Sequence, residues 1–230
     1  VFDKEKMEAE GTESDKLLKY VPNPLKNLAY QVKGKRTPDH RIRIINVKLS
    51  VRRVLDLARK EDVSLTVYLT ALYMWSVYQA KEHKAEDTKI SVSIPINLRQ
   101  FFPSVSVRNF FSTTIVSYIF KKGEPAELKD IYKEIDRQFQ KQLKKEEIEN
   151  RLARFVRFEY NPVIRIIPRP IKDVALKFIN YLNNQMITLA MSNLGIVNLP
   201  DEMKDYVEDI YFYTSVIRPQ FCMMSYEDHL

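Results

Sequence analysis

Three histidines and one cysteine are the side chains of this sequence best suited to acid–base or nucleophilic chemistry. Histidine titrates near neutral pH without help from its surroundings, so each is a candidate general base. His83 stands four residues before Asp87, but EHKAED is a charged connector in which a solvated imidazole with no catalytic role is expected. His40 lies in an irregular segment and His229 is next to the last residue, so we interpret both as surface residues.

Cys222, the single cysteine, lies in the apolar run FCMM. A nucleophilic thiol needs a neighbouring base and a lowered pKa, so an apolar strand favours a small core residue instead. One cysteine excludes a disulfide within the chain and a multi-cysteine metal site, and it is typical of a reducing cytosol. The four glycines form no phosphate-binding loop. We therefore predict no metal site and a cytoplasmic protein.

Small polar residues interrupt apolar stretches at two places. One is SIPINLRQFFPSVSVRNFFST, residues 93–113, and the other is MSNLG, residues 191–195, which is expected as a loop at the end of a strand. Polar groups at the ends of buried strands need hydrogen-bond partners. Those partners are either one another or a ligand, and the residues alone leave both alternatives open.

The basic residues select no partner by themselves. A net charge of +7 suits a nucleic acid, an acidic membrane or a phosphate-bearing ligand. Arg151, Arg154 and Arg157 follow one another at helical spacing in RLARFVR, which suits either a phosphate contact or a solvated helix face. Because basic residues are spread along the whole chain, the solvated face is favoured and no nucleic-acid partner is expected.

Length and composition indicate a folded chain with a real core. With 230 residues, 45% of them hydrophobic, the chain suits one large domain or one lobe of a larger protein. The opening VFDKEKMEAEGTES is charged and contains glycine and serine, so residues 1–38 are expected to be a connector and an irregular crossing segment. Residues 39–230 are expected to form the folded lobe. No window of about 18 apolar residues is present, so no membrane span is predicted.

Hydrophobic periodicity predicts a sheet layered with helices. Alternating apolar residues predict a strand at 41–50, and short runs rich in apolar residues predict strands at 88–96, 111–120, 185–192, 209–218 and 220–226. Helical spacing predicts helices after an N-cap at Ser50, at 64–81, at 128–143, again up to Asn161, and at 171–182. This alternation favours an α/β or α+β fold with a mixed β-sheet and flanking helices. Glu227 and Asp228 are turn residues after the last strand with no returning strand, so more protein is expected to follow.

Several of these stretches resemble the second half of bacterial alcohol acetyltransferase-like proteins, members of the coenzyme A-dependent acyltransferase superfamily. The resemblance runs from about residue 25 to the end, through KGKRTP, the helix pair VRRVLDLARKEDVSLTVYLTALYMWSV, ISVSIPINLRQFFPSVSVRNFF, FEYNPVIRIIPRPIKD and MSNLGIVNLP. It implies the chloramphenicol acetyltransferase fold shared by condensation domains, in which two α/β lobes face each other across a tunnel. This chain would be the C-terminal lobe, truncated at both ends.

In that superfamily the general base is the second histidine of an HHxxxDG motif in the first lobe. HKAED, residues 83–87, lacks the paired histidine and the glycine, so the resemblance implies a base in a missing N-terminal lobe and an inactive fragment. It also implies acyl-CoA as co-substrate, an alcohol or amine as acceptor, and no permanently bound cofactor. The DFGWG motif of the plant branch is absent.

The resemblance also assigns residues. Ser192 matches a position near the reacting carbonyl, where its hydroxyl would stabilise the oxyanion, with Asn193 and Gly195 shaping the loop. The family's Asn-x-Arg strand end and its Arg-Asn-Phe motif, both expected at the lobe interface near the tunnel, match Asn97, Arg99, Arg108, Asn109 and Phe110. Two other hypotheses stay open: a non-catalytic interaction module that retains the fold, and, more weakly, nucleic-acid binding through basic helix faces.

Overall fold

The computed structural model describes residues 28–34, 38–39, 41, 43–82, 86–105, 107–214 and 217–230. The described residues divide into two compact units, residue 28 with 141–186 and residues 29–140 with 187–230. The first 27 residues, His40 and His83 lie outside the described part. The predicted boundary after residue 38 and the roles given to those two histidines therefore stay predictions.

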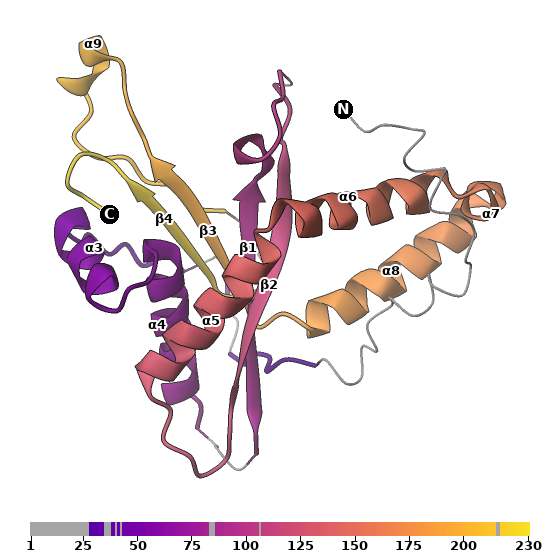
Figure 1. Cartoon of the computed structure of the whole chain (residues 1–230), viewed down its shortest axis with the longest axis horizontal. Helices are drawn as coiled ribbons and strands as arrows, with labels where there is room; N and C mark the ends of the chain where they lie inside the picture. The colour runs from indigo at the N-terminus through magenta and orange to yellow at the C-terminus, as the bar shows by residue number, and fades with distance from the viewer. Residues whose placement is uncertain are drawn as a thin grey trace. The chain divides into compact units, whose positions relative to one another are not determined.

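A four-stranded mixed sheet organises the larger unit (Figure 1). Its strands lie in the order β2-β1-β3-β4, where β1 is Thr88–Asn97, β2 is Phe111–Phe120, β3 is Leu189–Ile196 and β4 is Gln220–Ser225. β1 pairs with β2 antiparallel, whereas β1–β3 and β3–β4 are parallel. The predicted fold class, a mixed β-sheet with flanking helices, is confirmed.

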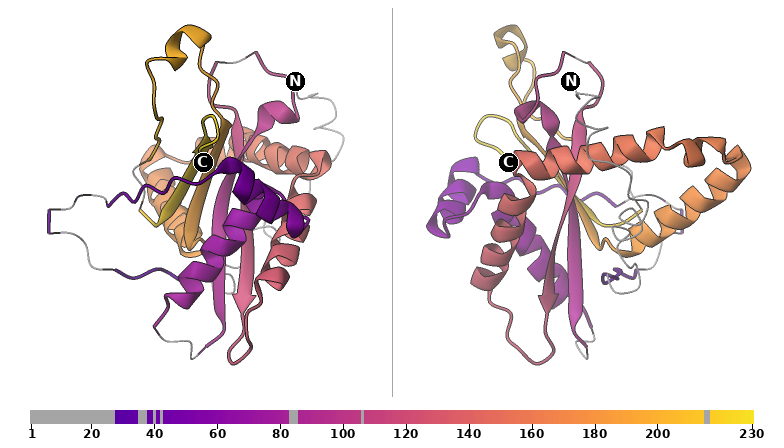
Figure 2. Two further views of the ribbon diagram at one scale, coloured as in Figure 1. Left: turned by 90° about the vertical axis from the view of Figure 1, so that its left-hand side faces the viewer. Right: turned by 45° about the vertical axis from the view of Figure 1, so that its right-hand side comes forward.

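Two helices, α4 (Leu65–Gln79) and α5 (Leu128–Gln142), cover one face of this sheet (Figures 1 and 2). Every second residue of β1 points toward them, which is why its apolar side chains alternate in the sequence. The core that results is made by Val67, Ala71, Met74, Tyr78, Ile90, Val92, Ile94, Val116, Phe120, Ile131 and Ile135.

Serine caps begin the two helices that precede β1. The Ser50 hydroxyl accepts a hydrogen bond from the Arg53 amide at the start of α3 (Val51–Lys60), and Ser64 accepts one from the Val67 amide at the start of α4. Each bond satisfies a backbone donor that the helix cannot pair internally. The predicted helices at these two positions are confirmed.

The outer edge of β2 is closed by a side chain of α5. The Gln138 amide accepts a hydrogen bond from the Ser117 N–H (2.9 Å) and donates one to the Ser117 carbonyl (2.8 Å). An open sheet edge invites pairing with another chain, and a side-chain amide that binds both backbone groups blocks it at that residue. This edge contrasts with the outer edge of β4, described below.

The smaller unit contains α6 (Lys145–Tyr160), α7 (Pro162–Ile166) and α8 (Arg169–Gln185). α6 ends before Asn161, and Pro170 stands in the first turn of α8, as predicted. The Arg151 guanidinium donates to the Gln142 side chain at 3.5 Å, and burial followed by the nearby Arg154 charge lowers its pKa. Arg151 is therefore not a fully solvated side chain, although the sequence favoured a solvated helix face for Arg151, Arg154 and Arg157.

Three strand predictions are wrong in whole or in part. Residues 43–49 form no strand, and of the predicted segment 41–50 only Ser50 makes an isolated bridge, to His229. The described residues of 209–218 are also irregular. β3 begins four residues later than the predicted 185 and continues to Ile196, so Asn193 and Gly195 lie within the strand and not in a loop after Ser192. Alternation predicts an extended backbone, but a ladder also needs a partner strand.

None of the helices in the described part is both long and apolar enough to cross a membrane.

Candidate functional site

The polar residues that follow β1 bind one another. The Asn97 side chain accepts a hydrogen bond from the Arg99 amide at 3.0 Å, which caps the short helix η2 (Leu98–Gln100). The Arg99 guanidinium donates to the Arg108 carbonyl at 2.8 Å, and the Leu98 amide donates to the Phe110 carbonyl at 3.1 Å. The loop between β1 and β2 is thus braced by its own residues, which favours the first of the two alternatives that the sequence left open.

Burial within this loop is uneven. Leu98 and Phe102 are buried and fix the loop to the unit, and Phe110 is half-buried. Arg108 and Asn109 are exposed near the end of the loop, just before β2. These two side chains are therefore among the exposed residues of the loop, and they are not part of the core.

The second polar group lies on β3. Ser192 is half-buried and pairs in register with Cys222 of β4. Its neighbours Leu189 and Met191 are buried toward α4, where the Thr70 hydroxyl donates to the Met191 sulfur at 2.8 Å. Because side chains alternate along a strand, Ser192 points to the face of the sheet that α4 and α5 do not cover.

Asn193 ties the end of β3 to the start of α4. Its side chain donates to the Thr66 hydroxyl at 3.2 Å and accepts a hydrogen bond from the Gly195 amide at 2.8 Å. Gly195 has a φ of +75°, a left-handed conformation that glycine adopts without strain, and the pairing of β3 with β4 is irregular there. A side chain larger than hydrogen at residue 195 would strain this bulge.

The polar residues that follow β1 and those on β3 both lie toward the carboxyl ends of these two parallel strands. β1 and β3 pair only through Val92 and Ser93 with Leu189 and Ala190, and beyond these residues the two strands diverge (Figure 1). In open α/β sheets, ligands bind outside the carboxyl ends of strands, where neighbours separate. The structure therefore brings the predicted residues to one end of the sheet, on two strands that no longer pair.

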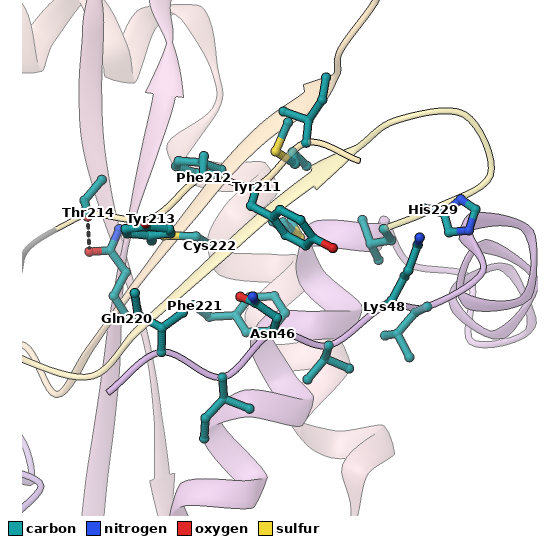
Figure 3. Close-up of a pocket in the computed structure, with 18 of the residues that line it drawn as sticks. Asn46, Lys48, Tyr211, Phe212, Tyr213, Thr214, Gln220, Phe221, Cys222 and His229 are labelled. Carbon is teal, nitrogen blue, oxygen red and sulfur yellow. Dashed lines mark hydrogen bonds between the residues drawn. The ribbon is translucent and has the colours of Figure 1, made fainter. Parts of the chain in front are cut away.

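A cavity of about 400 Å³ lies beside β4, the strand that pairs with β3 (Figure 3). It is bounded by β4, by residues 43–49 and by residues 209–214, and Cys222 lines it. Cys222 is half-buried and is not part of the core, so its predicted core position is wrong. His229 also lines the cavity and is exposed, as predicted for a surface residue. Alternating residues in both flanking segments were the sequence signal for this region, but they predicted strands and not a cavity.

An ion pair joins the two flanking segments. The Lys48 ammonium lies 2.6 Å from the Asp209 carboxylate, which also accepts a hydrogen bond from the Tyr211 hydroxyl at 3.3 Å. The hydrogen bond from Lys48 lowers the pKa of Asp209, and the same bond raises the pKa of Lys48. Both groups are thus charged at neutral pH. Among the described residues, no group of three or more His, Cys, Asp or Glu side chains could hold a metal ion.

Tyr73 of α4 gives the region a measurable response to high pH. Burial, and then the nearby Cys222, raise the pKa of Tyr73 to about 12, and its ring packs 5.7 Å from that of Phe221. In the unfolded chain the Tyr73 hydroxyl loses its proton near pH 10, whereas in the folded chain it keeps the proton up to about pH 12. The contribution of this protonated phenol to folding stability is therefore complete below pH 10 and is lost as the pH rises to about 12. Between these values we expect the native chain to lose about 1–2 kcal/mol more stability than Tyr73→Phe, allowing for solvent screening.

Urea unfolding of both proteins from pH 9 to pH 12 measures this difference. Tyr206→Phe, at a tyrosine that is 88% exposed, is the matched control and should follow the native profile. Parallel profiles for the native chain and Tyr73→Phe would show that the phenol is not held protonated by burial.

Comparisons with known proteins place the chain in a family. Two solved structures that match are vinorine synthase (14% identity, TM-score 0.38, covering 64% of this chain and 32% of that one) and polyketide synthase associated protein 5 from Mycobacterium tuberculosis (13% identity, TM-score 0.38, 65% and 38%). The chain thus spans about a third of the length of these proteins. No curated protein matches it in sequence. The model of the alcohol acetyltransferase family matches residues 16–224, nearly the whole chain, and the chain therefore belongs to the alcohol acetyltransferase family.

Proposed function

We propose that this chain is the C-terminal lobe of an enzyme that transfers an acyl group from acyl-CoA to the hydroxyl of an acceptor. The observation that carries the proposal is the family match over residues 16–224. The chain's share of about a third of the two matched structures supports a second lobe elsewhere in the protein. The acceptor is an alcohol in this proposal, with an amine as the alternative nucleophile.

The general base belongs to the other lobe in this proposal. His229 is the histidine in the described part of the chain, and it lies in the turn after β4, separate from Ser192 on β3. An imidazole from the other lobe would take the proton of the acceptor hydroxyl as its oxygen attacks the thioester carbonyl. The tetrahedral oxyanion would then collapse, re-forming the carbonyl, and expel the CoA thiolate, which recovers the proton.

Ser192 is the oxyanion donor that we assign to this lobe. Its position on the uncovered face of β3, near the point where β1 and β3 diverge, supports the assignment. A hydroxyl there donates to negative charge that develops only in the transition state, which is how such a group accelerates acyl transfer. Arg108 and Asn109, exposed at the end of the β1–β2 loop, are assigned to the lobe interface.

Thiol release from acetyl-CoA tests the proposal. The full-length protein and this chain are each incubated with acetyl-CoA and a panel of primary alcohols, and free CoA is followed with a thiol reagent. We expect turnover by the full-length protein and none by the chain alone. Turnover by the chain would contradict a base in another lobe. A full-length protein that binds acyl-CoA but turns over no acceptor would favour the interaction module instead.

A further inference from the structure

A tight turn after β4 sends the chain back along its outer edge. Tyr226 and His229 exchange both backbone hydrogen bonds, each 3.0 Å long, around Glu227 and Asp228. Glu227 has a φ of +52°, the left-handed conformation found at the first central position of two-residue hairpin turns. From His229 onward, the backbone therefore runs antiparallel to β4.

His229 and the next residue, Leu230, also pair with the end of segment 43–49 and Ser50. Leu49 and Leu230 exchange both backbone hydrogen bonds, at 3.0 and 2.9 Å, and Ser50 forms an antiparallel bridge with His229. His229 and Leu230 thus lie between the end of β4 and the end of segment 43–49. Because each strand spacing is about 4.8 Å, β4 and that segment are roughly 9–10 Å apart here, which leaves the width of one strand between them.

Away from the turn, no strand lies between β4 and segment 43–49 in the described part of the chain. Segment 43–49 runs alongside β4, and the cavity of about 400 Å³ lies between them (Figure 3). In the part of the chain that the structure describes, no backbone hydrogen bond joins β4 to residues 43–48. The side chains of Ile45 and Val47 are 86% and 62% exposed, although their alternating pattern predicts a paired strand.

The backbone of β4 is oriented to accept a partner there. On the side of β3, the Pro219 carbonyl accepts a hydrogen bond from the Ala190 amide, and the Ser225 carbonyl accepts one from the amide of Val197, the residue after β3. Backbone groups of successive residues point to opposite edges of a strand, so Gln220, Cys222 and Met224 direct theirs into the cavity. Tyr226 is the next residue in that series, and its groups are already paired with His229.

We infer that the cavity is a slot for one β-strand, joined in cis to Leu230, that runs antiparallel to both β4 and residues 43–49 and pairs with both. The strand would extend the sheet from four strands to six, because residues 43–49 then gain the partner that they lack. Its length would match the six residues of β4. The occupant is a strand of this polypeptide because Leu230 already forms the first rung on one side and His229 on the other. This inference does not depend on the acyltransferase proposal.

Amide hydrogen exchange of the chain as it stands makes the first test. The Cys222 and Met224 amides should exchange at least tenfold faster than those of Phe221 and Met223, which point to β3. Equal protection of both sets would overturn the inference, since the edge would not be open.

Extension of the chain makes the second test. One variant carries seven residues of alternating Thr and Val after Leu230, and its matched control carries alternating Gly and Ser. We expect at least tenfold slower exchange of the Cys222, Met224, Ile45 and Val47 amides in the first variant and none in the control. Unchanged exchange, or protection that appears only as protein concentration rises, would overturn the inference, the latter in favour of a second copy. Protection of the same amides in the full-length protein should come with protection of residues that follow Leu230.

Discussion

Replacing Phe120 with alanine is expected to lower the free energy of unfolding by about 3–5 kcal/mol. Phe120 is 1% exposed, and its ring stacks on Tyr78 with centroids 4.1 Å apart and meets Tyr118 edge-on at 4.9 Å. The substitution removes the buried ring and leaves a cavity between β2 and α4 that rigid neighbours fill only in part. Because domains of this kind have a stability of about 5–15 kcal/mol, this loss is a large share of the total.

Urea unfolding followed by circular dichroism measures the change. Phe111→Ala is the matched control, since it removes the same side chain from the same strand at a position that is 56% exposed. It should shift the free energy of unfolding by no more than about 0.5 kcal/mol. Equal losses for the two variants would show that Phe120 is not packed as the structure describes.

Replacing Ser192 with alanine in the full-length protein is expected to lower kcat by about 10²- to 10³-fold, with little change in KM for acyl-CoA. This expectation rests on the proposed role of the hydroxyl as an oxyanion donor, which acts in the transition state and not in the bound substrate. Ser192→Thr keeps a hydroxyl at the same position and should retain more activity than alanine. Steady-state thiol release at varied acyl-CoA and acceptor concentrations gives both parameters.

Ser76→Ala is the control for this prediction, because Ser76 is exposed on α4 and its hydroxyl binds only the Leu72 carbonyl of its own helix among the described contacts. Its kcat should be that of the native protein. A decrease of less than about threefold in Ser192→Ala, with an unchanged circular dichroism spectrum, would remove Ser192 from the catalytic assignment.

Residues that depend on local partners were predicted well. Ser50 caps the helix that follows it and a helix begins after Ser64, and the alternation of β1 places its apolar residues in the core. β1 and β2 follow one another in the sequence and are joined by residues 98–110, so each finds its antiparallel partner within the same stretch of sequence. Helix caps and hairpin pairing are local in the chain, and local sequence therefore carries their signal.

The candidate site was only partly predictable. The sequence singled out Asn97 and Arg99 but left open whether they bind each other or a ligand, and the bond from Arg99 to the Arg108 carbonyl shows a braced loop. Asn193 was expected in a loop after the strand, yet its pairing with Met223 keeps it within β3. Parallel pairing joins residues distant in sequence, so where such a strand ends depends on a partner that local periodicity does not reveal.

The sequence by itself determined most of the helices, the strands β1 and β2, the two polar motifs and the resemblance to alcohol acetyltransferases. Only the tertiary structure decided which alternating segments become strands. Residues 43–49 and 220–225 are both predicted as strands, but β4 gains β3 as a partner, whereas of residues 43–49 the described backbone hydrogen bonds pair only Leu49. The physical reason is that a strand is completed by the backbone hydrogen bonds of its neighbours, which are a property of the assembled sheet and not of the segment.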